Sequence, residues 1–531
     1  MRKAGAVSRW FVAAMCLLCI GCGSAMAAGA IAWFDGERPG AQARQAVELL
    51  SAAASHGLEP RDYDAATLEQ AVRRAGQGAP LDAGRIAQLE SALSTSMQRY
   101  LADLHDGRVD PRQLDQDYNP PHREAFDPAA VLQAALAARR LPDAVREAAP
   151  QVPLYEHLRE AMARYRALGD PAAWRQPLPP LPADKRGGGG KLEPGMPYAG
   201  LMVLAQRLVV LGDFAPDALP SVDAARYQAP LVEAVVAFQQ RHGLAADGVV
   251  GKATLAQLQV PPAARVRQIE LALERLRWTP LMQGPRMIVI NIPEFVLRAY
   301  EVRDGRIGLH EEMKVVVGKA MRTRTPLFDE DMRFIEFSPY WNVPPSIARG
   351  ETVPKLRSDP GYFDREGFEF VGPDGSVNTT LSEAVLDDVL AGRSRIRQRP
   401  GPKNALGDIK FVFPNRANVY LHHTPATQLF ERERRDFSHG CIRVERPVAL
   451  AKFVLQGMPE WTEERIRQAM ARGESATLRL AEPVPVLIAY GTTLVKRGQT
   501  YFFEDLYGQD RRLDAALRQR PKPQLTMIDR P

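Results

Sequence analysis

A chain of 531 residues is long enough for three or four domains, each with a real apolar core. Its 69 Lys and Arg residues outweigh 63 Asp and Glu residues by a formal net charge of only +6, which is too mild to indicate a nucleic-acid-binding protein. A small positive charge would suit an acidic polymer.

Residues 1–27 are predicted to be a signal peptide that is removed on export. Three basic residues without an acid precede the apolar stretch "WFVAAMCLLCIGCG", which is too short to span a membrane comfortably, and "SAMAAGA" supplies the small residues of a cleavage site. Two alternatives are a retained inner-membrane anchor and lipid attachment at Cys22. The second is the weaker, because "CIGC" lacks the usual leucine three positions before the cysteine.

Cleavage after this segment would leave one cysteine, Cys441, and lower the net charge to +3, since three of the four cysteines and three basic residues lie within it. An exported protein with a single thiol cannot form an internal disulfide. Cys441 is therefore either reactive or buried and inert.

Residues 28–175 are predicted to form a helical domain, because "QAVELLSAAASHG" and "DPAAVLQAALAARR" repeat apolar residues at helical spacing. Residues 176–197 are rich in proline and glycine and are predicted to be a linker or a long exposed loop.

Residues 198–260 are predicted to be a small three-helix unit. Its stretch "AFQQRHGLAADGVVGKAT" resembles the peptidoglycan-binding module, and the residues that carry the resemblance are Phe238, Gly243, Asp247, Gly248, Gly251 and Thr254. The alternative is that Asp247 and the glycines only shape a loop and cap a helix. A member of this family can keep the fold without the binding.

Residues 285–482 are predicted to be a mainly β domain, because "RMIVINIPEFVLRAYE" and "DIKFVFPNRANVYLHH" are rich in β-branched and aromatic residues. The polar segment 345–400 interrupts these strands and is predicted to be a lid or cap. Residues 483–531 are predicted to add a strand pair and a terminal helix to the same domain. The predicted fold class is thus multidomain α+β.

The stretch "LHHTPATQLFERERRDFSHGCIRVERP", residues 421–447, concentrates three histidines around the single cysteine. A nucleophilic thiol needs a base, which His422, His423 or His439 could supply. It also needs hydrogen-bond donors for the oxyanion, which the backbone of "SHGC" could supply because Gly440 permits a sharp turn. Adjacent residues of a strand face opposite sides, so we expect only one of His422 and His423 to face Cys441.

Two other interpretations of this stretch remain open on spacing alone. Three histidines and a cysteine could bind zinc, but "HH" and "HGC" are poor ligand spacings, so no metal site is predicted. Cys441 could also be buried and inert, with the histidines in ordinary hydrogen bonds.

His422 followed by "SHGCIR" sixteen positions later resembles the signature of the L,D-transpeptidase catalytic domain. "FSPYWNVPPSIARGETVPKLRSDPGYF" and "PGPKNALGDIKFVFPN" extend the resemblance to the large periplasmic L,D-transpeptidases of Gram-negative bacteria, which also have an N-terminal scaffold domain, a peptidoglycan-binding module and a capping insertion. Arg443 stands where many relatives have asparagine, as in the large periplasmic subgroup. His423 stands where many have Asp or Ser, which leaves the group that orients His422 undetermined.

The resemblance implies a cysteine enzyme of the periplasm that acts on peptidoglycan tetrapeptide stems without a cofactor. Cys441 would attack the carbonyl of the diamino acid and expel D-Ala, His422 would move protons, and the amides of His439, Gly440 and Cys441 would bind the oxyanion. His439 would aid the thiolate or, more simply, shape its loop.

Four further residues are candidates for substrate binding. Arg443 could pair with a substrate carboxylate or, alternatively, with Glu445. Tyr420 and Trp341 could line the groove for the donor stem, although aromatic residues on strands are more often core, and Ser438 completes the set.

The preferred function is formation of 3→3 cross-links through a Cys441 thioester. Alternatives are L,D-carboxypeptidation, attachment of a lipoprotein to the wall, and a non-catalytic wall-binding protein. Other cell-wall synthesis proteins are candidate partners. The sequence does not indicate the oligomeric state.

Overall fold

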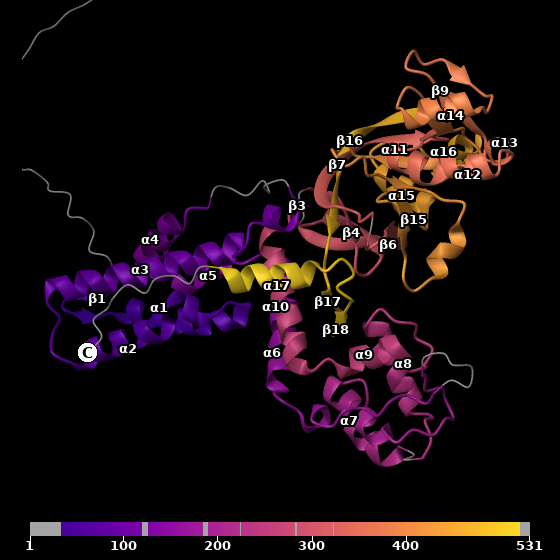
Figure 1. Cartoon of the computed structure of the whole chain (residues 1–531). Coiled ribbons are helices and arrows are strands. Elements are labelled where there is room, and N and C mark those ends of the chain that lie inside the picture. The colour runs from indigo at the N-terminus through magenta and orange to yellow at the C-terminus, as the bar shows by residue number, and fades with distance from the viewer. Residues whose placement is uncertain are drawn as a thin grey trace, which may run out of the picture.

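The structure, a computed structural model, describes residues 33–118, 126–183, 190–222, 225–281, 284–321 and 323–520, so the predicted signal peptide lies outside it. A helical N-terminal part, a small helical unit and a mainly β part with a helical insertion are arranged around the helix α10 (Pro262–Trp278) (Figure 1). This arrangement confirms the multidomain α+β class. No helix in the described ranges has the length and apolarity needed to cross a bilayer.

The N-terminal part is a bundle of amphipathic helices around one apolar core. The side chains of Leu50, Leu93, Leu101 and Leu141 are fully buried in this core. Asp82 and Asp127 begin two of the helices by accepting hydrogen bonds from free backbone amides of the first turn. The helices are α1 (Ala41–Ser51), α2 (Ala65–Gln77), α3 (Ala83–Asp106), α4 (Pro128–Ala138) and α5 (Leu141–Ala148).

The small helical unit contains α7 (Leu201–Leu211), α8 (Leu231–Arg241) and α9 (Lys252–Gln259). The side chain of Gln239 on α8 organises the following loop, since it bonds the Gly248 amide, the Val249 carbonyl and the Thr254 hydroxyl. Leu178 and Leu192, which both lie within the predicted linker 176–197, are buried in this unit's core. The linker region is therefore anchored at both ends.

Helix α10 and helix α6 (Pro153–Ala167) pack against each other and share an apolar cluster with Phe502. α10 also contains Glu274, which is fully buried and paired with Arg108 from the N-terminal part and with Arg277 one turn later. This helix therefore connects the N-terminal bundle to the β part through both apolar and ionic contacts.

The β part is built on a large sheet in the order β12-β13-β15-β6-β5-β4-β16-β7-β3, with β14 paired to β6. β12 also pairs with β7, so the sheet closes on itself. The strands are β3 (Gln116–Asp117), β4 (Arg286–Asn291), β5 (Val296–Arg303), β6 (Arg306–Gly318), β7 (Leu327–Phe337), β12 (Ile409–Val412), β13 (Leu421–His422), β14 (Asp436–Ser438), β15 (Ile442–Val444) and β16 (Ala476–Ala489). Helices α15 (Pro447–Val454) and α16 (Glu463–Ala471) pack on the core enclosed by the sheet.

One strand of this sheet comes from far away in the sequence. β3 belongs to the N-terminal part and pairs in parallel with the start of β7, Gln116 opposite Leu327. The side chain of the neighbouring Tyr118 is buried in the core of the β part and donates a hydrogen bond to the carbonyl of Ile488. The N-terminal part and the β part therefore share a sheet.

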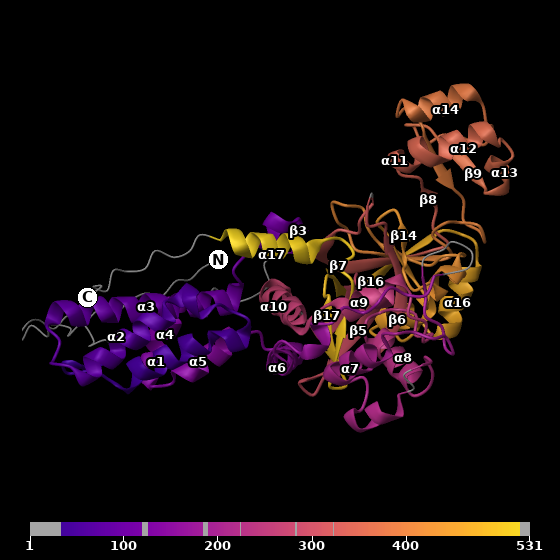
Figure 2. The same ribbon diagram turned by 60° about the horizontal axis from the view of Figure 1, so that its bottom comes forward.

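The segment predicted to be a cap folds as a separate layer with its own core. Figure 2 shows it projecting from the rim of the large sheet. Phe363 and Phe370 stack at its centre, 4.9 Å between ring centroids. Its elements are β8 (Trp341–Asn342), α11 (Pro345–Ile347), a π-helical turn (Ala348–Thr352), α12 (Val353–Ser358), α13 (Tyr362–Arg365), β9 (Phe368–Val371), β10 (Val377–Asn378), α14 (Glu383–Leu390) and β11 (Arg395–Gln398).

The C-terminal segment forms the hairpin β17 (Thr493–Lys496) and β18 (Gln499–Phe502), followed by helix α17 (Gln509–Gln519). Leu513 of α17 is buried in the core of the β part. The helix also reaches the N-terminal part, because Arg520 just after it forms a two-point ion pair with Asp103 of α3. It therefore bridges the two parts rather than packing on one.

Candidate active site

The two paired strands β13 and β15 bring the predicted site residues together. They run parallel, with Leu421 opposite Ile442 and His422 opposite Arg443. Leu421 and Ile442 are fully buried in the core. Because side chains alternate along a strand, the flanking residues face the other way and form one group: Tyr420, His422, Cys441 and Arg443.

The orientation of His422 is set by its own backbone neighbour. The Nδ1 of His422 is hydrogen-bonded to the carbonyl of His423, and a carbonyl can only accept, so Nδ1 carries the proton. Nε2 of the neutral ring is then the unprotonated nitrogen, and a second backbone hydrogen bond, with Leu406, also acts on the pKa of His422 by raising it. The side chain of His423 turns to the opposite side, where its Nδ1 meets Asp408 at 2.6 Å. The adjacent histidines thus face opposite sides, and a backbone carbonyl orients His422.

Burial favours the uncharged forms of both Cys441 and His422. Desolvation, with a smaller contribution from the positive charge of Arg443, lowers the pKa of His422 to about 3. Desolvation raises the pKa of the Cys441 thiol, although a hydrogen bond with Tyr420 and the charges of Lys410 and Arg443 oppose this. At neutral pH Cys441 is therefore a thiol, with its Sγ 3.7 Å from the carbonyl oxygen of Asn418, and His422 is a neutral imidazole.

Alkylation of Cys441 by iodoacetamide should report this resting state. Because burial raises the pKa of the thiol, the thiolate is scarce at neutral pH, and the alkylation rate should rise about tenfold per pH unit from pH 7 to pH 9. Mass spectrometry over a pH series measures it. A rate that is already constant between pH 5 and pH 7 would instead indicate a preformed thiolate–imidazolium pair.

The turn before Cys441 is fixed by hydrogen bonds within "SHGC". The hydroxyl of Ser438 donates to the carbonyl of Cys441 at 2.6 Å and accepts from the amide of Gly440 at 3.2 Å. Gly440 has a φ of +119°, a region that favours glycine. These bonds occupy the Gly440 amide but not those of His439 and Cys441, which are thus the amides available for an oxyanion.

A second loop, which contains Gly318 and Thr325, supports this turn through hydrogen bonds. The hydroxyl of Thr325 donates to the carbonyl of Gly440 at 2.8 Å and accepts from the amide of Gly318. Only glycine fits at 318, because a Cβ there would lie 2.0 Å from the carbonyl oxygen of Thr323. Tyr507, from the C-terminal segment, donates to the Gly318 carbonyl at 2.6 Å and accepts from the Thr325 amide. The position of Cys441 thus depends on residues that have no recognisable sequence motif.

Replacing Tyr507 with phenylalanine should loosen this support. The Gly318 carbonyl and the Thr325 amide would each lose a buried partner, so we expect a loss of about 1–3 kcal/mol in the free energy of unfolding, seen as a lower thermal midpoint. Tyr501→Phe is the matched control, since its half-buried ring lies under Lys496. Equal midpoints for both variants would contradict the supporting role of the Tyr507 hydroxyl.

The remaining predicted residues lie in different surroundings. His439 is exposed and points to the insertion, where its Nε2 meets Glu351 at 2.7 Å. Trp341 packs against the insertion's own apolar cluster. Glu445 pairs with Lys314, and no acidic group among the described residues lies within ion-pair distance of Arg443. The Nε of Arg443 is buried without a hydrogen-bond partner, so the alternative in which Arg443 pairs with Glu445 is not seen.

The part of the chain that the structure describes contains no cluster of three or more His, Cys, Asp or Glu side chains suited to a metal ion. The three histidines of residues 421–447 diverge to a backbone carbonyl, Asp408 and Glu351. Their donor atoms do not converge on a common point, and the zinc interpretation has no support in the side-chain arrangement.

Family models match three parts of the chain. The L,D-transpeptidase catalytic domain matches residues 285–462, a scaffold domain matches residues 26–162, and a "putative peptidoglycan binding domain" matches residues 200–258. A "Putative L,D-transpeptidase" of Haemophilus influenzae is 31% identical over 252 residues, 47% of this chain and 49% of that protein. The similarity thus spans about half the length of that relative.

Two solved structures also resemble parts of the chain. One is a fused zinc-dependent amidase/peptidase/peptidoglycan-binding protein from Clostridium acetobutylicum, with 12% identity over 56% of this chain and 99% of that one and a TM-score of 0.18. The other is Bdellovibrio bacteriovorus Bd1075, with 14% identity over 44% of this chain and 56% of that one and a TM-score of 0.17. Scores this low do not establish a shared overall fold.

Proposed function

We propose that this chain, which carries the catalytic domain of the L,D-transpeptidases together with a scaffold domain and a peptidoglycan-binding domain, forms 3→3 cross-links between peptidoglycan stem peptides. The observation that carries the proposal is the tautomer of His422. Because its Nδ1 is bonded to the His423 carbonyl, its Nε2 is the unprotonated nitrogen, and His422 lies opposite Arg443, two residues after Cys441, on the paired strands.

The reaction would proceed through a thioester in two steps. Sγ of Cys441 attacks the carbonyl carbon of the diamino acid while His422 accepts the thiol proton. The peptide bond to the terminal D-Ala breaks, and the proton passes to the departing amine. The side-chain amine of a second stem then attacks the thioester, losing its proton to His422 and returning the thiol. One peptide bond replaces another, so no cofactor is needed.

The charge that develops on the carbonyl oxygen needs donors near Cys441. The amides of His439 and Cys441 are the candidates, because the hydrogen bonds within the turn do not use them. The Gly440 amide would first have to release the hydroxyl of Ser438. Ser438 is in this account a positioning residue. His439 would act on its loop through the contact with Glu351 rather than on the thiol.

Arg443 would hold a carboxylate of the donor stem. Its half-buried guanidinium lies on the same face as Cys441, its pKa is lowered by desolvation, and its buried Nε has no partner. A substrate carboxylate would satisfy it with a charge-assisted hydrogen bond. Tyr420, which meets Cys441, would line the same end of the groove. Trp341 could line it only near the insertion.

Residues 345–400 are proposed to act as a lid that positions the stem, because Glu351 in this segment contacts the catalytic turn. Replacing the segment with a short Gly/Ser linker should therefore lower cross-linking strongly while leaving Cys441 reactive toward iodoacetamide. Mass spectrometry of both products measures the two effects. Full cross-linking by the shortened chain would rule out the lid.

The peptidoglycan-acting domains and the predicted signal peptide, residues 1–27, support a periplasmic location, with an inner-membrane anchor as the alternative. Peptidoglycan is the proposed partner, and other cell-wall synthesis proteins are candidates. The domain limits proposed from the sequence are 28–175, 176–197, 198–260, 285–482 and 483–531.

The test is incubation of the chain with disaccharide-tetrapeptide, followed by mass spectrometry, with Cys441→Ala as control. A product with the mass of two substrates less one D-Ala, absent with the variant, is expected. Tripeptide alone would favour L,D-carboxypeptidation, and transfer only to a supplied lipoprotein would favour wall attachment. No product with either chain would favour a non-catalytic wall-binding protein.

A further inference from the structure

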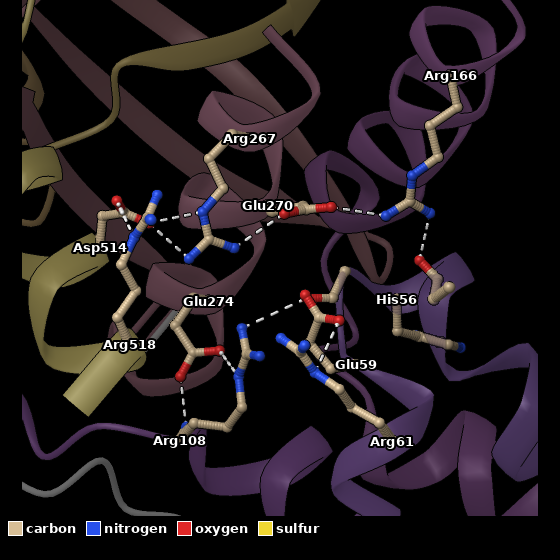
Figure 3. Close-up of polar contacts among 12 residues, drawn as sticks. His56, Glu59, Arg61, Arg108, Arg166, Arg267, Glu270, Glu274, Asp514 and Arg518 are labelled. Atoms are coloured by element: carbon tan, nitrogen blue, oxygen red, sulfur yellow. Dashed lines mark hydrogen bonds and ion pairs between the residues drawn. The ribbon is translucent and has the colours of Figure 1, made fainter. Parts of the chain in front are cut away.

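An arginine-rich cleft of about 690 Å³ lies between the N-terminal bundle, α10 and α17, away from the strand pair that bears Cys441. Three parts of the chain that are distant in sequence build it (Figure 3). Six of its ten lining residues are arginines: Arg61, Arg99, Arg108, Arg267, Arg518 and Arg520. Its volume suits a ligand of several residues rather than a single small ion.

Several of these arginines are held in place by acids at the back of the cleft. Arg108 pairs with the fully buried Glu274 at 3.0 Å, and Arg520 makes two contacts of 2.7 Å with Asp103. Arg267 lies between Asp514 and Glu270, at 2.7 and 2.9 Å, as Figure 3 shows. Their positions are therefore fixed before any ligand arrives, which lowers the entropic cost of binding.

Two arginines keep most of their donors free. Among the described residues Arg99 donates only to the backbone carbonyl of Asp62, and Asp64, an acid that its charge affects, forms no ion pair with it. Arg61 is 71% exposed and only loosely paired with Glu59, at 3.6 Å. Guanidinium groups with free donors beside fixed ones form a surface that can take carboxylates in two-point contacts.

The cleft is not purely cationic. Glu59, Asp62 and Glu270 also line it. These acids would repel a ligand that carries only negative charge, such as a phosphate polymer, but they suit a ligand with ammonium groups among its carboxylates. The stem peptide of peptidoglycan is such a ligand, because its diamino acid carries a free amine and the peptide also carries free carboxylates.

We infer that this cleft binds a peptidoglycan stem peptide that is not the one being cleaved, so that the chain holds the wall at a second point away from Cys441. The carboxylates of the stem pair with Arg61 and Arg99, and its amine lies toward Glu59 and Asp62. The class of ligand in this inference rests on the proposed function, whereas the location of the site rests on the cleft alone.

The test measures binding of soluble disaccharide-tetrapeptide to the full chain by isothermal titration calorimetry, in a Cys441→Ala background that prevents turnover. We expect two bound ligands per chain. Adding Arg61→Gln and Arg99→Gln should weaken one binding event at least tenfold, because two charge-assisted contacts are lost. Arg333→Gln with Arg472→Gln, exposed arginines outside the cleft, is the matched control and should retain both events.

Two outcomes would overturn the inference. Unchanged isotherms for the Arg61→Gln/Arg99→Gln chain would show that the cleft binds no stem. Equal affinity of that site for a ligand with its amine acetylated, or for tripolyphosphate, would show that the site reads negative charge alone. Cross-linking by the unmodified chain is measured separately, so loss of the proposed reaction with retention of the second binding event, or the reverse, separates the two proposals.

Discussion

Replacing His422 with glutamine is expected to slow acylation of Cys441 by about 10²–10⁴-fold, the usual contribution of a positioned general base. Glutamine can keep the hydrogen bond to the His423 carbonyl through its amide N–H, but it offers no basic nitrogen to the thiol. Because the resting thiol has a raised pKa, the variant must wait for rare spontaneous ionisation. Acylation by a penem-type β-lactam, followed by mass spectrometry, measures the rate.

The pH dependence of the same reaction identifies the base. With His422 present, its pKa of about 3 leaves the imidazole neutral and able to accept a proton throughout pH 5–8, so the rate should lack a histidine limb in that range. In the His422→Gln chain the rate should rise with pH as the thiolate forms. His423→Gln is the matched comparison, since that side chain faces Asp408, and its loss should be far smaller. Equal losses for both variants would remove His422 from the base role.

Replacing Glu274 with glutamine is expected to cost about 3–5 kcal/mol of stability, because it leaves buried positive charge without its partner. Glu274 is fully buried and pairs with both Arg108 and Arg277, so one substitution breaks the connection between α10 and the N-terminal part. Arg277 is itself fully buried. A lower thermal midpoint and faster proteolysis between the N-terminal bundle and α10 should follow.

Glu463→Gln provides the control for Glu274→Gln. Glu463 also pairs with two basic residues, Lys452 and Arg467, but all three are exposed to solvent. Exposed ion pairs contribute little, so its thermal midpoint should stay close to that of the unaltered chain. Similar midpoints for the two variants would mean that burial of the Glu274 pair contributes nothing.

The arrangement of the residues around Cys441 could be predicted from local sequence because it is local. "SHGC" is one turn, and the alternation of a strand was enough to expect that His422 and His423 face opposite sides. What stayed unpredicted depends on contacts between distant segments. Thr325, which lies 115 residues before Gly440 in the sequence, donates a hydrogen bond to its carbonyl. Tyr507, from the C-terminal segment, acts indirectly, because it donates to the carbonyl of Gly318 in the loop that contains Thr325. Neither has a local pattern that distinguishes it from an ordinary threonine or tyrosine.

For the fold as well, local features could be predicted from the sequence and contacts between distant segments could not. Periodicity identified the helical N-terminal part, the small helical unit and the β part, whose family matches cover residues 26–162, 200–258 and 285–462. Periodicity could not identify β3, because two residues in an extended conformation carry no pattern and their partner lies more than two hundred positions later. Nor could it show that α17 touches both parts, since that contact is an ion pair between Arg520 and Asp103.

The shared sheet has a consequence for how the chain reaches its final form. A polypeptide that is synthesised from its N-terminus presents Gln116 and Asp117 long before Leu327 and Phe328 have emerged. β3 must therefore wait with its backbone groups unpaired until β7 arrives, and such late, long-range pairing is intrinsically slow. We expect the waiting segment around β3 to be the part of the nascent chain most in need of a chaperone.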